Sequence, residues 1–391
     1  MNEAQLSGGA EFALPHGSRS LLPPAAAGPR PGRMLGSLLL TLGALWGCVP
    51  DREPIVLGVV GSWNTTDMGA RQAVETAVRE INARGGVRGR QLEVRVRDDG
   101  FGAERAVRIA QEFVADRSVV AVIGHSHSNP TLAASQIYDG HLAAISPTAT
   151  SPELAGASRW LFRLSPDDAR AGATLARFAN VRGLRRAVVL YSNTSNGAAS
   201  AAAFQRHFRG EIVGIDPILP QKTTPADVEP FITHYRRKRP DVVYIGGFAT
   251  TGEAVLREIR RQGLEVEVLT EEIPINRMAD DRLPANLYFV SRRMGRGPGL
   301  QRFETAFIQQ HGRPPSIYAS LAYEAVMLLT QAMERAGTHR KAIRDYLDAL
   351  DANHPGHGVA GPVWFDAAGG PAARNLSVCN SAGTCISARD F

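Results

Sequence analysis

The chain has 391 residues, of which 44% are hydrophobic and 21% are charged. This length and balance predict a folded globular protein with room for two domains, and they exclude a disordered chain. The net charge of +6 does not indicate nucleic-acid binding, because the basic residues are scattered over predicted polar helix faces. The densest group, residues 236–239, ends a predicted helix, where cations complement the helix dipole.

The first 48 residues differ in composition from the rest. Residues 1–33 are rich in Gly, Pro, Ala and Ser, so we expect them to be disordered or to be a mis-assigned start before Met34. Residues 34–48 hold an apolar run that is too short to span a membrane and has the length of a signal-peptide core. Its end, LWGC, resembles the lipobox of bacterial lipoproteins, which implies lipidation of Cys48. A buried free cysteine after an ordinary signal sequence is the alternative.

From residue 55 the chain alternates short apolar strands with amphipathic helices. The predicted strands of a first series are residues 55–61, 92–99, 119–124 and 142–147. Those of a second series are residues 187–192, 211–218, 241–247 and 266–271. Between the first two strands, apolar residues recur at i, i+3, i+4 and i+7 from Val74 to Ile81, which predicts a helix.

Strands that alternate with helices are typical of parallel sheets covered on both faces. The two series therefore predict an α/β fold with two doubly wound parallel-sheet lobes and a ligand cleft between them. After residues 287–291 the pattern changes to consecutive helices, and a short β ending closes the chain.

One turn raises the question of catalysis. Residues 124–128, GHSHS, follow a predicted strand and are one residue away from the G-x-S-x-G turn that presents the nucleophile of α/β-hydrolases. Ser128 replaces the second glycine, and His354 and His357, which are late enough in the chain to complete a triad, lie in a Gly/Pro loop. We therefore expect no enzyme, with a serine hydrolase that uses Ser126 as the remote alternative.

The chain from about residue 53 to 380 resembles the type I periplasmic solute-binding proteins of ABC transporters, and among them the leucine/isoleucine/valine-binding (branched-chain amino acid) branch. The resemblance lies in the order of the segments INARGGVRGRQLEVRVRDDG, VVAVIGH, AAISPTATSPEL, FRLSPDD and DVVYIGGF. It implies that the chain crosses three times between the lobes and that these crossings form a hinge. The implied lobes are residues 53–165 plus 297–356 and residues 166–296 plus 357–391.

The resemblance also implies how one end of a ligand would be held. Ser128 and Thr150 would bind an α-carboxylate with their hydroxyls, together with backbone groups of Thr148. Hydroxyls suit a dry site, because every ligand oxygen needs a partner there. A helix that starts near Ser128 would add backbone N–H groups and the positive end of its dipole. A helix cap at Ser128 and an ordinary turn at Thr150 are the alternatives.

The α-ammonium would face acceptors from the other lobe. The resemblance implies Glu272 and Asp168 for this role, with Glu271 in place of Glu272 if the register shifts by one residue. The alternatives are exposed loop acids for the glutamates and a helix cap for Asp168.

Four further positions would line the pocket. Trp63 would take the place of a family aromatic in a shortened loop, and Asn196 stands where the family has a tyrosine. Phe248 keeps a family ring without its hydroxyl, and Tyr323 matches a pocket aromatic. Ordinary packing is the alternative for Trp63 and Tyr323. These differences leave the ligand open beyond an amino acid or a similar small carboxylate.

The remaining expectations concern cysteines, cofactors and partners. Cys379 and Cys385 would form a small disulfide loop in an exported protein, and two reduced thiols are the alternative. No metal-ligand spacing and no P-loop pattern occurs, so we expect no metal and no cofactor. The chain would be an exported monomer, periplasmic or on the cell surface, with a lipid anchor in a membrane. It would deliver its ligand to an ABC permease; a ligand-sensing subunit of a receptor or regulator is the alternative.

Overall fold

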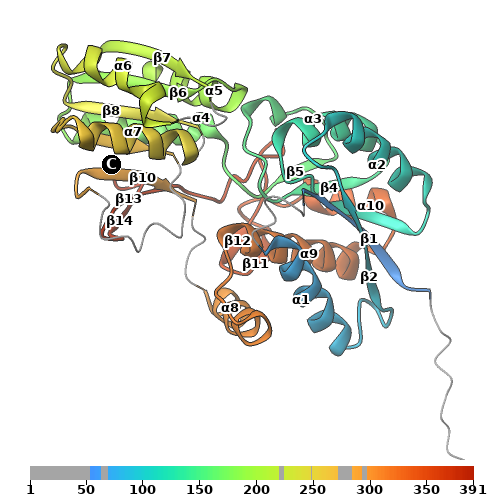
Figure 1. Cartoon of the computed structure of the whole chain (residues 1–391). Coiled ribbons are helices and arrows are strands. Elements are labelled where there is room, and N and C mark those ends of the chain that lie inside the picture. The colour runs from blue at the N-terminus through green and yellow to red at the C-terminus, as the bar shows by residue number, and fades with distance from the viewer. Residues whose placement is uncertain (1–52, 63–68, 220–223, 248, 272–283, 293–296) are drawn as a thin grey trace, which may run out of the picture. The chain divides into compact units, whose positions relative to one another are not determined.

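Figure 1 presents a computed structural model of the chain. The structure describes residues 53–62, 69–219, 224–247, 249–271, 284–292 and 297–391. The predicted signal segment with Cys48 lies outside these ranges, as do Trp63, Phe248 and Glu272. None of the helices in these ranges combines the length and the apolar character that crossing a membrane requires.

The first lobe is built on a parallel sheet with the strand order β2-β1-β3-β4-β5. Its strands are β1 (Ile55–Gly61), β2 (Leu92–Asp98), β3 (Val119–Ile123), β4 (Ala143–Ser146) and β5 (Leu161–Arg163). Along β1, Ile55, Leu57 and Val59 pack into one core, and Val56 and Val60 pack into another. A strand buried on both faces carries apolar residues at every position, which explains the unbroken run IVLGVV.

Helices cover both faces of this sheet (Figure 1). One face carries α1 (Ala70–Ala83), α8 (Pro298–His311), α9 (Ile317–Ala336) and α10 (Arg340–Asp348). The other face carries α2 (Ala103–Ala115) and α3 (Ser128–Tyr138). A short 3₁₀ turn, η1 (Pro152–Leu154), precedes β5, and a small antiparallel pair, β11 (Gly356–Gly358) and β12 (Gly361–Val363), follows α10.

The second lobe has a mixed sheet with the strand order β14-β13-β10-β9-β8-β6-β7. Its parallel strands are β6 (Arg186–Ser192), β7 (Glu211–Ile218), β8 (Val242–Gly246), β9 (Glu267–Thr270) and β10 (Leu287–Ser291). The antiparallel strands β13 (Ser377–Asn380) and β14 (Cys385–Ser387) extend it beyond β10. The structure joins Cys379 to Cys385 in a disulfide across this last pair.

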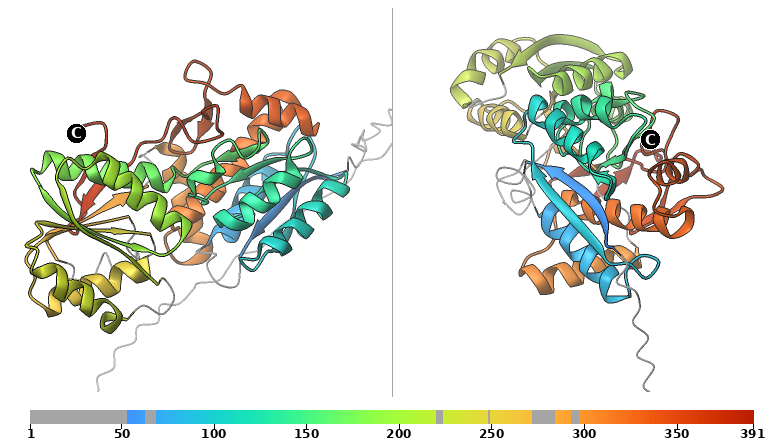
Figure 2. Two further views of the ribbon diagram at one scale, coloured as in Figure 1. Left: turned by 90° about the horizontal axis from the view of Figure 1, so that it is seen from above. Right: turned by 90° about the vertical axis from the view of Figure 1, so that its right-hand side faces the viewer.

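The helices of the second lobe again lie on both faces of their sheet. Figure 2 shows, in its left view, the green helices α4 (Asp168–Val181) and α5 (Ser195–His207) on one face and the yellow helices α6 (Pro225–Arg236) and α7 (Ala249–Arg261) on the other. The two helix pairs pack on separate apolar clusters, which alternate residues of β6 supply: Ala187 and Val189 to one, Val188 and Leu190 to the other.

The chain passes three times between the two lobes. It leaves the first sheet after β5, returns to it with α8, and leaves it again between β12 and β13. The predicted fold class, two doubly wound lobes with three crossings, is confirmed. Val359, Val363 and Phe365 pack into the first core, although the sequence analysis assigned the residues from 357 onward to the second lobe. The other lobe boundaries stay predictions.

Candidate functional site

The predicted turn at residues 124–128 lies at the carboxyl end of β3. The Gly124 N–H donates to the Ile145 carbonyl at 2.9 Å, which ties the turn to the neighbouring strand β4. Helix α3 begins at Ser128, as predicted. Ligands of α/β sheets bind outside the carboxyl ends of the strands, so this turn is at the edge of the sheet where a ligand site is expected.

His125, in the same turn, is fully buried and bonded on both ring nitrogens. Its Nδ1 lies 2.7 Å from Asp99 Oδ2, and its Nε2 lies 3.2 Å from the Tyr138 hydroxyl. Asp99 also accepts a 2.8 Å hydrogen bond from the Ser62 hydroxyl. Burial opposes the charge of Asp99, but the hydrogen bond with His125 holds the pKa of this carboxyl below its usual value. Because both nitrogens of His125 have other partners, this arrangement does not place it as a base for Ser126.

Two hydroxyls connect the turn to the loop after β4. Thr148 Oγ1 donates to the Ser126 carbonyl at 2.6 Å. Ser128 Oγ accepts a 3.1 Å hydrogen bond from the Ser151 N–H. The predicted contacts Ser128 and Thr148 therefore belong to one hydrogen-bonded unit in the first lobe, and Ser128 remains half-buried. A hydroxyl oxygen that accepts one bond can still donate its proton to a ligand carboxylate.

Thr150, Asn196 and Asp168 meet directly in the structure. The Asn196 amide nitrogen donates to Thr150 Oγ1 at 3.2 Å and to Asp168 Oδ2 at 2.6 Å. The Asp168 N–H donates to the Thr150 carbonyl at 3.0 Å. Asp168 is the first residue of α4, and Asp167 caps that helix by accepting from the Arg170 N–H. The capping role considered for Asp168 therefore belongs to its neighbour, and the Asp168 carboxylate is left for other contacts.

Arg292 is a polar partner that the sequence analysis missed. Its Nη2 lies 2.6 Å from Asp168 Oδ1, and the two side chains are 17% and 7% exposed. Arg292 directly follows β10, at the carboxyl end of a parallel strand. A charged residue at the end of a strand was the sequence signal that could have identified Arg292 as a site residue. Its partner could not be inferred in the same way, because Asp168 is 124 residues away in the chain.

Glu271, the alternative to Glu272, is buried just after β9 and is 3% exposed. It accepts hydrogen bonds from the Ser200 hydroxyl and, at 2.5 Å, from the Tyr244 hydroxyl. Burial, followed by the nearby charge of Asp168, raises the pKa of this carboxyl well above its usual value, although Arg292 acts in the opposite direction. Glu271 is thus part of the interior of the second lobe, next to the charged pair of Asp168 and Arg292.

We expect the substitution Glu271→Gln to change how stability depends on pH. The folded-state pKa of Glu271 lies above its unfolded value of 4.5, so its stabilising contribution is complete below that value and is lost as the pH rises through the folded-state pKa. Each unit of difference corresponds to about 1.4 kcal/mol. Urea unfolding over a pH series should show this loss in the wild type and not in the variant.

Glu304→Gln, on the exposed side of α8, is the control for this experiment and should leave the pH curve unchanged. Parallel curves for the wild type and Glu271→Gln would contradict the expectation.

Tyr323 lies in the core of the first lobe. Its hydroxyl donates to Glu80 Oε2 at 2.6 Å, and its ring packs 4.2 Å from that of Phe303, measured between centroids. These partners on α1 and α8 account for its burial. Among the described residues, no hydrogen bond links it to Ser128, Thr150 or Asp168, so its role as a ligand contact stays a prediction.

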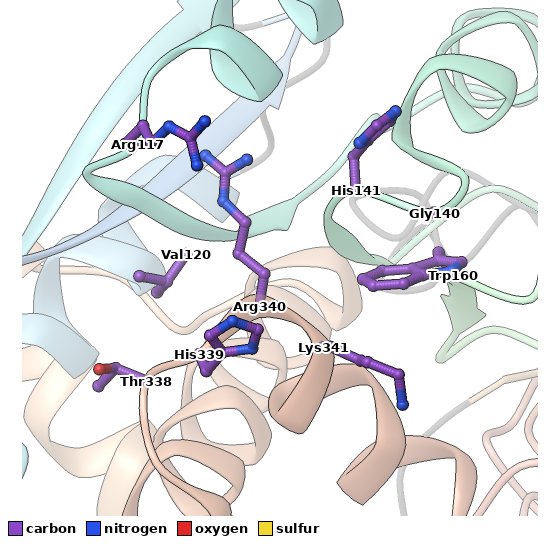
Figure 3. Close-up of a pocket in the computed structure, with 9 residues that line it drawn as sticks. All are labelled: Arg117, Val120, Gly140, His141, Trp160, Thr338, His339, Arg340 and Lys341. Atoms are coloured by element: carbon purple, nitrogen blue, oxygen red, sulfur yellow. The ribbon is translucent and has the colours of Figure 1, made fainter.

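Figure 3 shows a cavity of about 370 Å³ in the first lobe. Its lining residues are Arg117, Val120, Gly140, His141, Trp160, Thr338, His339, Arg340 and Lys341. Arg340 donates to the carbonyls of Val119 and Val114, which fixes its guanidinium at the end of α2. Val120 belongs to the first half of β3 and Arg117 precedes that strand, whereas the predicted ligand contacts follow its carboxyl end. This cavity is therefore separate from the candidate ligand site.

Metal coordination finds no support in the described part of the chain. No three His, Cys, Asp or Glu side chains gather there as a metal site requires. The polar groups that do come together are hydroxyls, an amide and the Asp168–Arg292 pair. These groups suit the recognition of a small polar ligand by hydrogen bonds and charge.

Comparison with known proteins places this arrangement in context. A leucine-specific-binding protein of Salmonella typhimurium is 28% identical over 323 residues, which cover 80% of this chain and 85% of that protein. A leucine-, isoleucine-, valine-, threonine- and alanine-binding protein of Pseudomonas aeruginosa is 26% identical and covers 67% of this chain and 72% of its own length. These relatives are solute-binding proteins.

Solved structures share the fold. An ABC transporter substrate-binding protein from Desulfitobacterium hafniense, in complex with Leu, has a TM-score of 0.73 at 29% identity, with 86% of this chain and 99% of that chain covered. A branched-chain amino acid transporter substrate binding protein from Streptococcus pneumoniae, in complex with isoleucine, has a TM-score of 0.75 at 22% identity, with 85% and 99% covered. Residues 55–382 match the family described as periplasmic binding protein. Because this match spans most of the chain and both lobes, the chain belongs to the periplasmic binding protein family.

Proposed function

We propose that this protein captures an amino acid, branched-chain or a similar small carboxylate, between its two lobes and delivers it to an ABC transporter, without catalysis. The observation that carries the proposal is the meeting of Thr150 from the first lobe with Asn196 and Asp168 from the second. A ligand bound there would touch both lobes, and a hinge of three crossings would let the lobes close around it. The relatives that bind leucine and other amino acids support the choice of ligand class.

The two ends of the ligand would be recognised by different chemistry. The α-carboxylate would accept from the hydroxyls of Ser128 and Thr150 and from backbone N–H groups at the start of α3. The α-ammonium would approach Asp168, where it competes with the neutral amide of Asn196. A cation binds a carboxylate more strongly than a neutral donor does; because Arg292 already pairs with Asp168 Oδ1, the ammonium would replace Asn196 at Oδ2 only. Glu272, Trp63 and Phe248 complete the proposed pocket but lie outside the described residues.

The proposal includes an exported location and a membrane partner. We infer that the apolar segment at residues 34–48 directs export to the periplasm or the cell surface and that Cys48 carries the lipid anchor. The protein would work there as a monomer that presents its ligand to the permease. Membership of the periplasmic binding protein family supports the exported location.

A thermal-shift titration of the full chain with leucine tests the proposed ligand class. A ligand at 100 times its dissociation constant adds about 2.7 kcal/mol of stability, which raises the melting temperature visibly. Thr150→Val removes a hydroxyl at the site, and we expect it to weaken binding about tenfold to a hundredfold, the usual cost of a hydrogen bond to a charged group.

Thr305→Val on the exposed side of α8 is the matched control and should bind as the wild type does. Binding of leucine that is equally strong in Thr150→Val would contradict the proposed site. The absence of a shift with leucine, isoleucine and valine would contradict the proposed ligand class.

A further inference from the structure

Positive side chains gather in the cavity of the first lobe, away from the candidate ligand site. The volume of about 370 Å³ falls within the range of small-molecule sites, about 300 to 1,000 Å³. Among the described residues that line the cavity there is no Asp or Glu, whereas two arginines, a lysine and two histidines are present. A concave site lined by charges of one sign concentrates ligands of the opposite sign, so this composition favours an anion.

The two arginines bring their charges close together. Figure 3 shows the guanidinium groups of Arg117 and Arg340 pointing toward each other. Burial, followed by the charge of Arg117, lowers the pKa of Arg340 below its usual value, as neighbouring like charges do. Within the described ranges the Arg117 side chain has no ion pair, and the carboxylate of the adjacent Asp116 pairs with Arg95 instead. No acid therefore compensates the repulsion between the two guanidinium groups.

The two guanidinium groups can play different parts in binding an anion. Arg340 donates to four backbone carbonyls between residues 113 and 119. Neutral carbonyls hold this group in place but leave its charge unmatched. Arg117 is exposed, and its planar group can donate two parallel hydrogen bonds to one oxyanion. The pair thus combines a fixed charge with a donor that is able to adapt to a ligand.

The start of α10 adds to the positive potential of the cavity. His339 precedes this helix without a capping hydrogen bond from its side chain, and the first turn has no acidic residue. The first backbone N–H groups of a helix have no partner within it and carry the positive end of its dipole. The Thr338 hydroxyl accepts from Arg90 at 3.4 Å, which leaves its proton for a ligand oxygen. Lys341 adds less, because its ammonium is 2.6 Å from Asp345.

We propose that this cavity binds a phosphate monoester, with the phosphate at Arg117 and Arg340 and the organic part against Trp160 and Val120. A phosphate monoester carries a charge of about −1.5 to −2 at pH 7, which matches two guanidinium groups better than the single charge of a carboxylate does. The side chains of Trp160 and Val120 supply the apolar part of the lining. The site is independent of the proposed amino-acid site, because the cavity lies at the amino end of β3.

Phosphate monoesters occur as soluble metabolites and as lipid headgroups, and the position of the cavity suits both. Arg90, which contacts Thr338, also donates to the carbonyls of Glu53 and Pro54. The cavity therefore borders the point where the chain enters the first lobe. Cys48, which carries the lipid anchor in the proposed function, precedes Glu53 by five positions, and five residues span at most about 18 Å. A headgroup of the same membrane would then be within reach.

Isothermal titration calorimetry of the full chain with glycerol 3-phosphate tests the soluble source. Arg117→Ala should bind about tenfold or more weakly, because a hydrogen bond to a charged group is lost, and Arg117→Glu should abolish binding. Arg206→Glu, on the exposed side of α5 in the second lobe, changes the net charge as Arg117→Glu does and should bind as the wild type does. Acetate, with its single charge, should bind at least about tenfold more weakly than glycerol 3-phosphate.

Flotation with phosphatidylcholine vesicles that contain phosphatidic acid tests the lipid source, since this lipid has a phosphate monoester as its headgroup. The full chain carries Cys48→Ser in this experiment, so that its own lipidation cannot cause binding, and vesicles of pure phosphatidylcholine give the background. Binding above the background that Arg117→Glu abolishes and Arg206→Glu retains would assign the headgroup as ligand.

Three results would overturn the inference. The first is the absence of binding to both glycerol 3-phosphate and phosphatidic acid. The others are equal binding of the phosphate ligand by the wild type and Arg117→Glu, and equal affinities for glycerol 3-phosphate and acetate. Arg117→Ala should leave the thermal shift with leucine unchanged, so that failure of this site and failure of the proposed function are read from different ligands.

Discussion

Gly124→Ala is expected to lower the free energy of unfolding by about 3 kcal/mol or more. A Cβ atom at this position would lie 2.1 Å from the Val60 carbonyl oxygen, and the residue has a φ of +125°. The Val60 backbone cannot move aside as a flexible side chain can, so the added methyl group would overpack this contact. The unfavourable φ of the alanine adds a second cost. Urea unfolding of the purified variant measures the loss.

Gly140→Ala separates the two causes. Gly140 also has a positive φ, +75°, but a Cβ there would meet no atom within 4 Å. Gly140→Ala should therefore lower the free energy of unfolding only by the cost of a positive φ in alanine, about 1 to 2 kcal/mol. Equal losses in the two variants would mean that the close approach to Val60 has no energetic weight.

This glycine bears on the question of catalysis. Gly124 is required because β1 and β3 lie side by side, and Val60 belongs to β1. The packing of β1 against β3 therefore accounts for the glycine in this turn. In hydrolases the glycine is required by crowding around a nucleophile, and no such cause is needed here.

Arg374→Met is expected to lower the free energy of unfolding by about 3 to 5 kcal/mol. Arg374 forms an ion pair with Glu324 of α9, whose side chain is fully buried. Burial lowers the pKa of Arg374 to about 10. Removing the guanidinium would leave the Glu324 carboxylate buried without its counter-charge, which is the costly way to break such a pair. Urea unfolding at neutral pH measures the change.

A second substitution tests the cause of that loss. Glu324→Gln keeps an oxygen to accept the Val359 N–H, which lies 3.1 Å from Glu324 Oε1. In the Glu324→Gln background, Arg374→Met should cost less, since no buried charge remains. Lys341→Met, which breaks the exposed pair with Asp345 on α10, should leave the free energy of unfolding nearly unchanged. Additive losses in the double variant would contradict the explanation.

This ion pair connects the last crossing to the first lobe. Arg374 lies between β12 and β13, on the last crossing, and Glu324 lies in the core of the first lobe. Arg170 of α4 also donates to the Arg374 carbonyl at 2.9 Å. The last crossing is thus held by polar contacts both to α9 of the first lobe and to α4 of the second.

Several features follow from the sequence alone, because they depend on neighbours a few residues apart. Strand and helix periods report which faces are buried, and the apolar runs predicted the strands β1 and β3. The alternation of these elements predicted two doubly wound lobes. The segments that resemble a family added the three crossings, and the structure has them.

Other features depend on packing between distant segments, which periodicity does not report. Arg292 finds Asp168 across 124 positions of sequence, and Glu271 is buried by Tyr244 and Ser200 from other elements. Tyr323 lies in a predicted helix, but its hydrogen bond with Glu80 of another helix could not be read from that pattern. Local pattern determines which elements form, whereas the order of strands in a sheet determines which side chains meet at its edge. The fold could therefore be predicted from the sequence, but the contacts of the candidate site were decided by the tertiary structure.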